Sequence, residues 1–342
     1  MRANHAPPRA AHFMTFKNVF SITAIIVLAI TLPAFAAEQA TQRGVMIRPA
    51  TIYISPDPSS ARLAQIERGR EVAILEHSNQ WLHVFATLAG QRTMNPITEE
   101  DSDIADVRDV SGWIVGKGVI TASTPNGDKI LFGAAADAEA EASQRGGRKG
   151  AAGDAFFLYL RTQEYFPTSP LAGEALYRAA DIKWQLDRMD VMSRPSAHAR
   201  QAYLREGMNE DLMKKVIKKY PNTKWADRAA FHLIENKLCG DWQGTSGCPK
   251  KEAEIYEKYA RERPDSPDAA EALYDAAWRL AALIQIYKTE EKAKDSDQAK
   301  AHAMDVAQQI VSKYPQSDWA DRAQTLLYML HQDIPTYGNE ME

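Results

Sequence analysis

The chain has 342 residues, long enough for two domains, and its content of 45% hydrophobic and 25% charged residues is that of an ordinary globular protein. Three of its 41 basic residues and none of its 45 acidic residues precede Ala37, so the chain from there on carries 38 positive and 45 negative side chains, a net charge of −7. This acidic balance, without a basic stripe, disfavours nucleic acid as a partner, and we expect none.

The N-terminus has the pattern of an export signal. Basic residues precede a 14-residue apolar run from Val19 to Leu32, and Ala34-Phe35-Ala36 follows it. Small side chains at positions 34 and 36 suit a signal peptidase that cuts before Ala37. The run is shorter than the about 20 residues that cross a membrane. We therefore predict that residues 1–36 are a signal peptide and that the mature chain is periplasmic or secreted, with membrane attachment only if the signal stays uncleaved.

The leader leaves two questions open. Residues 1–13 are polar, and a start at Met14 gives a more ordinary signal than a start at Met1, so the sequence does not decide between the two. It also does not separate a periplasmic from a secreted protein. No cysteine lies near the cleavage site, so we expect no lipid anchor.

Residues 43–122 have the pattern of a small β domain. Apolar and polar side chains alternate from Val45 to Ile54, with an interruption at Pro49, and alternate again after the turn at Gly69. Later segments begin at Trp81 and Gly112. Five short strands with glycine-marked turns predict a small barrel.

This segment resembles the bacterial SH3 domain. The resemblance rests on the opening Val-x-Ile-Arg and Ile-Tyr-x-Ser-Pro between Val45 and Pro56, and on three later motifs, Gly69-Arg-Glu-Val72, Trp81-Leu-His-Val84 and Gly112-Trp-Ile114. It departs from the family at the insertion Ala89–Val110, which carries acidic residues from Glu99 to Asp103 where the family has a short loop.

The aromatic residues of this segment have two interpretations. Trp81 and Trp113 suit the core of a barrel. The family also presents an aromatic groove that contacts cell-wall peptides or proline-rich segments, which makes Tyr53 and Trp81 candidate binding residues, because aromatic faces suit peptide and sugar stacking. The acidic insertion argues mildly against an anionic wall polymer, since like charges repel at low salt.

Residues 123–153 are predicted to be a linker with a short helix. A turn-forming segment, Ser123–Asp128, opens it, and the Ala/Glu-rich stretch 134–144 consists of strong helix formers. The basic, glycine-rich stretch Arg145–Gly150 then forms a joint before the next domain.

Residues 154–332 contain four copies of one pattern, and repeats of this kind indicate an array of similar units. The two clearest copies are Lys219-Tyr-Pro-Asn-Thr-Lys-Trp-Ala-Asp-Arg-Ala229 and Lys313-Tyr-Pro-Gln-Ser-Asp-Trp-Ala-Asp-Arg-Ala323. Each copy has a hydroxyl residue two positions after its proline, alanines five and eight positions after it, and an aliphatic residue nine positions before it. The four prolines are Pro167, Pro221, Pro264 and Pro315.

Each position of the pattern has a physical cause. Proline ends the preceding helix, and the hydroxyl residue suits the N-cap of the next one. Alanines at a three-residue spacing share one helix face and let two helices approach closely. Each unit is therefore predicted to be a helix, a tight turn and a second helix. Trp225 and Trp319 occupy the same position in their copies, which favours packing between repeats over a ligand platform.

The array resembles the tetratricopeptide-like hairpins of bacterial envelope proteins, such as those of the outer-membrane assembly lipoprotein and the periplasmic cell-division coordinator. The shared signature is Tyr-Pro-x-Ser/Thr-x-x-Ala-x-x-Ala. The prolines lie 54, 43 and 51 residues apart, against 34 in the standard repeat, and the insertions Asp190–Asn209 and Lys288–Gln298 account for the excess. Four unrelated hairpins in an ordinary bundle are the alternative.

The chain has two cysteines, Cys239 and Cys248, with three glycines between them. In an exported chain this pair predicts a disulfide-closed loop. On the chain-entropy account such a loop stabilises the fold by about 2–3 kcal/mol. A metal site needs more ligands than two thiols, and a catalytic cysteine needs a histidine partner, whereas the nearby His232 suits a helix face.

The sequence lacks the common catalytic motifs. His-Glu-x-x-His, Gly-x-Ser-x-Gly and the phosphate-binding Gly-x-x-x-x-Gly-Lys-Ser/Thr are all absent. We therefore expect no catalytic residues, no metal and no cofactor, and we predict that the protein is not an enzyme.

The predicted fold is α+β and multidomain, with a small SH3-like β barrel at 43–122, a tetratricopeptide-like α-helical hairpin repeat domain at 154–332 and a tail at 333–342. By analogy, we expect a non-catalytic exported binding or scaffold protein of the cell envelope, whose helices bind a protein or peptide partner. The alternative is recognition of peptidoglycan by the SH3-like domain, with the repeats as a spacer. An enzyme with an unrecognised site is a third, disfavoured class. The sequence identifies neither the ligand nor the oligomeric state.

Overall fold

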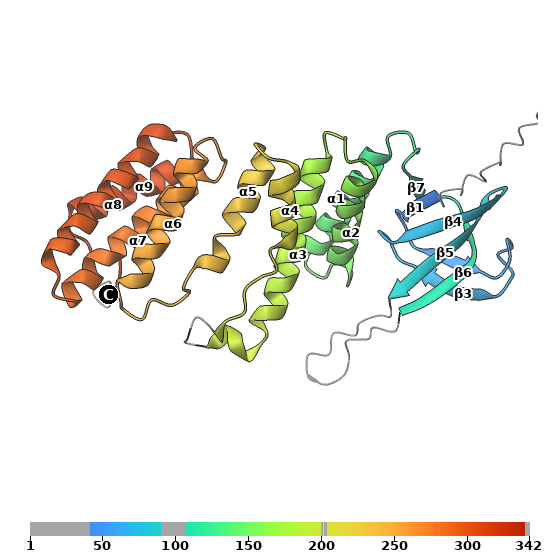
Figure 1. The fold of residues 1–342 in the computed structure, drawn as a ribbon, viewed down its shortest axis with the longest axis horizontal. Coiled ribbons are helices and arrows are strands. Elements are labelled where there is room, and N and C mark those ends of the chain that lie inside the picture. Colours follow the sequence, from blue (N-terminus) through green and yellow to red (C-terminus); the bar gives the residue numbers. More distant parts are fainter. Residues whose placement is uncertain (1–41, 90–106, 200, 202–203, 339–342) are drawn as a thin grey trace, which may run out of the picture. The chain divides into compact units, whose positions relative to one another are not determined.

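The computed structural model describes residues 42–89, 107–199, 201 and 204–338. In this part of the chain a β region is followed by an α-helical region, which is the α+β order that was predicted (Figure 1). The predicted signal peptide, residues 1–36, and the acidic residues Glu99–Asp103 lie outside the described residues. No helix among those described is long and apolar enough to cross a membrane.

The described β region is an antiparallel sheet of seven strands in the order β3-β2-β6-β5-β4-β1-β7. Seven strands replace the predicted five for two reasons: the first apolar run divides near Pro49, which has no N–H to donate to a ladder, and a short strand follows Gly118. The strands are β1 (Gln42–Met46), β2 (Ala50–Tyr53), β3 (Arg62–Ile66), β4 (Glu71–Ser78), β5 (Trp81–Ala89), β6 (Val107–Val115) and β7 (Val119–Thr121).

The longest pairing in the sheet joins β5 to β6, in register from Trp81 opposite Val115 to Ala89 opposite Val107. The two ends of the predicted insertion Ala89–Val110 therefore extend this hairpin. Alternate residues of β5, Leu82, Val84 and Ala86, enter the apolar core of the sheet. Their neighbours in the sequence face the other side, as the two-residue period of a strand requires.

The described helical region contains nine α-helices and two short 3-10 helices. The four predicted hairpins are present as α2 with α3, α4 with α5, α6 with α7, and α8 with α9. The helices are α1 (Gly127–Ser143), α2 (Ala151–Tyr165), α3 (Ala172–Met192), η1 (Pro195–His198), α4 (Asp211–Lys219), α5 (Lys224–His232), η3 (Glu235–Lys237), α6 (Gly247–Glu262), α7 (Ala269–Thr289), α8 (Ala293–Lys313) and α9 (Asp318–His331).

Helix α1 occupies most of the segment that was assigned to a linker. It has 17 residues, and its buried residues Leu131 and Ala135 pack in one apolar cluster with Leu158 of α2. The same cluster contains Val45 of β1 and Ile120 of β7. The β region and the first helices therefore share a hydrophobic core, so a cut within 123–153 would expose apolar surface on both sides.

Polar contacts reinforce this shared core. The Tyr165 hydroxyl of α2 donates a 2.5 Å hydrogen bond to Glu71 of β4, and the Arg161 guanidinium lies 3.4 Å from the same carboxylate. Burial of Tyr165, together with its bond to the Glu71 carboxylate, raises the pKa of the tyrosine hydroxyl. The hydroxyl therefore stays protonated and keeps donating across the junction throughout the neutral range.

The repeated alanines lie at the contacts between helices. All eight are at most 5% exposed. A larger side chain at these positions would push two helices apart, which explains why a small residue recurs. They are Ala172, Ala175, Ala226, Ala229, Ala269, Ala272, Ala320 and Ala323.

The predicted N-caps are correct in only part of the array. The Thr223 hydroxyl accepts a hydrogen bond from the Ala226 amide at the start of α5, as predicted. Ser317 stands at the N-cap of α9, but its hydroxyl donates to the Tyr314 carbonyl instead. Ser169 and Ser266 lie before the caps of α3 and α7, because each closes a turn by accepting from the amide two residues on.

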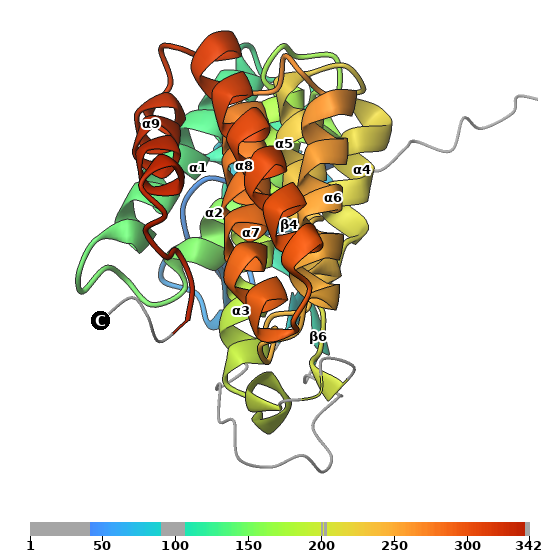
Figure 2. The ribbon, with the colours of Figure 1, turned by 90° about the vertical axis from the view of Figure 1, so that its left-hand side faces the viewer.

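Beyond the core that is shared with the β region, the helices form two packed groups. One apolar cluster joins α3, α4 and α5, and another joins α6 to α9, the group that Figure 2 turns towards the viewer. Side chains connect the groups: the Tyr259 hydroxyl donates a 2.9 Å bond to the Asp227 carbonyl, and the Arg263 guanidinium lies 2.5 Å from the Asp227 carboxylate. Long side chains at this junction leave room for a cavity.

We expect Ala320→Leu to lower the free energy of unfolding by about 1–3 kcal/mol, because added methyl groups overpack a close helix contact. Gln324→Leu, at an exposed position of the same helix, is the matched control and should leave the melting temperature nearly unchanged. Thermal melts followed by circular dichroism compare the two. Equal melts for Ala320→Leu and wild type would contradict the close-contact assignment.

Candidate functional site

The helical region repeats a unit of two hairpins, of which the first unit is α2–α5 and the second is α6–α9. Glu-Ala-Leu-Tyr occurs in α3, ending at Tyr177, and again in α7, ending at Tyr274. Trp225 of α5 stacks on Tyr177 with ring centroids 5.4 Å apart, and Trp319 of α9 lies 5.2 Å from Tyr274. The predicted role of the two tryptophans in packing between repeats is confirmed, and each contact joins one hairpin to the next.

The first repeated unit borders a cavity of about 430 Å³ between α3, α5, α6 and α7. Its walls combine aromatic, acidic and basic side chains that come from four separate stretches of the chain. The lining residues are Tyr177, Arg228, Phe231, His232, Ile234, Glu235, Leu238, Tyr256, Asp268, Glu271 and Asp275. We call this space the acidic cavity.

Electrostatics in the acidic cavity are unbalanced. Its walls carry four carboxylates against one guanidinium and one imidazole. Burial raises the pKa of Asp268, Glu271 and Asp275, and repulsion between these carboxylates raises the pKa of Glu271 further. The Arg228 and His232 side chains oppose this rise at Asp268, and the Arg279 guanidinium opposes it at Asp275. Glu235 forms an ion pair with Arg188 and Asp275 forms one with Arg279, so Asp268 and Glu271 are the carboxylates of the cavity that have no ion pair among the described residues.

His232 is held in place by α3. Its Nε2 atom lies 3.2 Å from the Tyr177 hydroxyl and 3.3 Å from the Asp181 carboxylate. These contacts fix the ring at the edge of the acidic cavity, on the helix face that the sequence suggested. Among the described residues, no group of three or more histidine, cysteine, aspartate and glutamate side chains is arranged to hold a metal ion.

The second repeated unit has a groove at the equivalent place, between α7 and α9, with a volume of about 200 Å³. Thr325, Leu326 and Met329 line it where Phe231, His232 and Glu235 line the acidic cavity, because α9 repeats α5 at an offset of 94 residues. The second space is therefore mainly apolar, and its other lining residues are Tyr274, Trp278, Pro335 and Thr336. We call it the aromatic groove.

Both spaces are lined by one face of α7. Glu271 and Asp275 line the acidic cavity, and Tyr274 and Trp278 line the aromatic groove. At about 100° per residue, these four positions fall within an arc of about 100°. We call this surface the α7 face.

The predicted disulfide between Cys239 and Cys248 is present. The loop that it closes is anchored by Glu252, which is only 2% exposed and accepts hydrogen bonds from the Cys239 amide, the Trp242 indole and the Arg279 guanidinium. The Trp242 ring lies 5.7 Å from the Trp278 ring. The loop therefore places an aromatic side chain beside the α7 face.

The two candidate binding residues of the β region differ in exposure. Trp81 is 6% exposed, and its ring meets the half-buried Tyr53 ring edge to face at 5.7 Å. Tyr53 lies opposite Trp113 in the sheet, and Trp113 stacks on His83 at 4.9 Å. Tyr53, Trp113 and His83 thus form an aromatic strip across β2, β6 and β5, while Trp81 offers little surface at its end.

Sequence reasoning missed several of these residues. Tyr177 and Tyr274 carried a signal, since Glu-Ala-Leu-Tyr is repeated, but the alignment on prolines did not extend that far. Trp242 lies inside the predicted disulfide loop, which had been considered only for stability. The acidic residues of the cavity left no local signal, because they meet only after the two units pack.

We expect reduction of the Cys239–Cys248 disulfide to lower the stability of the protein by about 2–3 kcal/mol. Reductant should lower the melting temperature of the wild type and leave that of Cys248→Ser, already lowered, unchanged. Peptide mapping without reduction should show the two cysteines linked. Thiols that alkylate fully without prior reduction would contradict the bond.

We expect Glu271→Gln to raise the melting temperature near neutral pH. The pKa of Glu271 is higher in the folded than in the unfolded chain, so ionisation of this carboxyl group opposes folding as the pH rises through that pKa. The gain should therefore shrink below about pH 4, where glutamate is protonated in both states. Glu254→Gln, at an exposed position, is the control. A gain that is independent of pH would contradict the electrostatic cause.

Comparisons with known proteins leave the family of this chain open. No protein-family model matches the chain, and no curated protein matches it. Among solved structures, a chain described as "DHF58 filament" aligns with 60% of this chain and 91% of its own length, at 13% sequence identity and a TM-score of 0.22. A likeness at that score carries no argument about fold or function.

Proposed function

We propose that the protein is a non-catalytic binding protein whose helical region binds an extended segment of a protein partner along the α7 face. The observation that carries this proposal is the meeting of the acidic cavity and the aromatic groove on one helix face. Residues from different hairpins converge there, as they do on the binding surfaces of repeat proteins. A bound segment would contact both spaces at once.

The chemistry of the acidic cavity favours a lysine or arginine side chain. Asp275 already has the Arg279 guanidinium as its partner, but the partly buried carboxylates of Asp268 and Glu271 gain from a cation that enters between them. The rings of Tyr177, Phe231 and Tyr256 line the same space, and aromatic faces attract cations. A basic side chain of the partner therefore satisfies both kinds of wall.

Binding rather than catalysis fits the walls of this cavity. Its lining residues include no serine, threonine, cysteine or lysine that could act as a nucleophile. His232 already has partners in Tyr177 and Asp181. The carboxylates lie among aromatic side chains, a setting that suits a bound cation.

We further propose that the β region is an SH3-like domain and that the hairpins are tetratricopeptide-like repeats of an envelope protein, exported by residues 1–36 to the periplasm or beyond. Short antiparallel strands and helical hairpins with proline turns support this assignment. Recognition of cell-wall peptidoglycan by the β region is the second candidate function. The aromatic strip of Tyr53, Trp113 and His83 favours it, because stacked rings suit peptide and sugar faces.

Charge reversal in the acidic cavity tests the first function. We expect Glu271→Lys to reduce capture of the partner from envelope extract at least about tenfold, because loss of a buried charge pair at an interface costs about 2–5 kcal/mol. Asp321→Lys, at an exposed position of α9, is the matched control and should capture the partner normally. Quantitative mass spectrometry of crosslinked complexes measures capture.

The same proteins separate the two functions. The full mature chain should be used, because the β region and the first helices share a core. Peptidoglycan co-sedimentation that is abolished by Trp113→Ala, together with capture that is indifferent to Glu271→Lys, would overturn the helical proposal in favour of wall recognition. A melting curve like that of the wild type shows that each variant is folded.

A further inference from the structure

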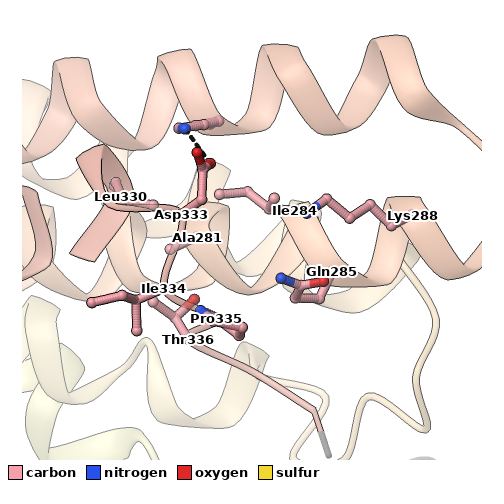
Figure 3. A pocket seen from close by; sticks show the side chains of 10 residues that line it. Ala281, Ile284, Gln285, Lys288, Leu330, Asp333, Ile334, Pro335 and Thr336 are labelled. Atoms are coloured by element: carbon pink, nitrogen blue, oxygen red, sulfur yellow. Dashed lines mark hydrogen bonds and ion pairs between the residues drawn. The ribbon is translucent and has the colours of Figure 1, made fainter. Parts of the chain in front are cut away.

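The segment after α9 turns back onto the helices. The Ile334 amide donates a 2.9 Å hydrogen bond to the Met329 carbonyl, which reverses the chain. The Asp333 carboxylate then pairs with Lys300 of α8 at 2.5 Å, the dashed contact in Figure 3. We call the described residues after α9 that follow this reversal, 333–338, the tail.

The tail lies against α7 over several residues. Figure 3 shows Ile334, Pro335 and Thr336 beside Ala281 of α7. The space left between them is about 20 Å³, which is room for about one water molecule. Thr336 is 8% exposed although it belongs to no helix or strand. The backbone of the tail therefore packs closely on the array.

Farther along, the tail borders the aromatic groove. Pro335 and Thr336 line the groove together with Tyr274 and Trp278 of α7. The Tyr337 ring lies 5.5 Å from the Trp242 ring of the disulfide loop. A short Pro-Thr-Tyr segment of this chain thus occupies part of the α7 face, between α7 and the loop.

The repeated architecture shows what this contact replaces. Beside Tyr177 of the first unit, helices α6 and α7 of the second unit cover the surface, and the acidic cavity is the space that remains between them. The described residues after α9 form no further helix, and the tail borders the equivalent space beside Tyr274. A terminal cap of a repeat array would lie at this place too.

The strength of the contact separates a cap from a removable segment. No tail residue belongs to the apolar cluster of α6–α9, and Ile334 remains 42% exposed. The ion pair with Lys300 is at the surface, where such pairs contribute little. The aromatic contact with Trp242 and the buried Thr336 are therefore the principal specific contacts of the tail, and they involve few apolar groups.

We propose that the tail is a built-in competitor that covers the part of the α7 face beside the aromatic groove in place of the partner's segment. This inference rests on the proposed function, and it adds the chemistry of the segment: an extended stretch in which an aromatic residue follows a proline by two positions, as in Pro335-Thr336-Tyr337. By displacing the tail the partner gains this part of the α7 face and a wider groove, and the acidic cavity, which no tail residue lines, stays open for its basic side chain.

A labelled synthetic peptide with the sequence of residues 332–342 serves as the probe. In the full chain, Tyr337→Ala removes the contact with Trp242 and should increase probe affinity about five- to tenfold, because the apparent affinity rises with the fraction of open grooves. Adding Trp278→Ala to Tyr337→Ala should abolish the gain. Tyr328→Ala, which removes a tyrosine of α9 that is 62% exposed, is the matched control and should bind the probe like the wild type.

Other outcomes overturn the proposal. Equal probe affinity of the wild type and Tyr337→Ala, or no binding to either, would show that the groove does not accept such a segment. A lowered melting temperature of Tyr337→Ala without any gain in probe affinity would show a structural cap. A wild-type dimer that dissociates in Tyr337→Ala would place the tail on a second copy instead. The probe affinity is measured again with a variant that ends at Gln332 and therefore lacks the tail.

The outcomes for the tail and for the proposed function are separable. If Glu271→Lys abolishes partner capture while Tyr337→Ala changes neither capture nor probe affinity, the helical binding function stands and the competitor fails. If Tyr337→Ala opens the groove to the probe while capture is indifferent to Glu271→Lys, the groove stands and the proposed function fails.

Discussion

Close approach of paired helices is the constraint on which the helical region depends. The eight repeated alanines have almost no exposed surface, so at these positions only an alanine methyl group separates one helix from the next. This closeness fixes where the longer side chains at the hairpin edges meet, including the Tyr177–Trp225 and Tyr274–Trp319 contacts. The grooves beside these contacts exist because backbone spacing is set by alanine while their walls are built from aromatic and charged residues.

The acidic cavity shows a conflict between stability and binding. Asp268, Glu271 and Asp275 lie where burial disfavours their charged forms, and a chain selected only for stability would place neutral groups there. Local charge of this kind is a common property of functional sites, although structural networks can also produce it. The aromatic groove, at the equivalent place in the second unit, has no such conflict. Two copies of one architecture have therefore diverged in the chemistry of their walls.

The sequence predicted best what short-range chemistry controls. Proline and alanine act within a few residues, so the four hairpins and their close contacts could be derived from spacing alone. Ser169 and Ser266 were assigned to N-caps wrongly, because the proline after each delays the helix and the hydroxyl closes a turn instead. The disulfide followed from the two cysteines, but the position of its Trp242 did not.

Contacts across the units could not be predicted in the same way. The acidic cavity takes residues from four stretches between Tyr177 and Asp275, and no local spacing relates them. The shared core of the β region with α1 and α2 was hidden for a similar reason, since Val45 and Leu158 lie far apart in the sequence. The tail carried no pattern at all before the groove that it borders was known.

The single face of α7 also constrains the sequence of any segment that binds there. Glu271 and Trp278 are seven residues apart on one helix, which is about 10 Å along the helix axis at 1.5 Å per residue. An extended chain advances about 3.3 Å per residue. A segment lying parallel to the axis would therefore cover the distance in about three residues, so its basic residue and its proline would stand about three positions apart. A short linear motif of this spacing, in either chain direction, is the ligand that such a surface would select.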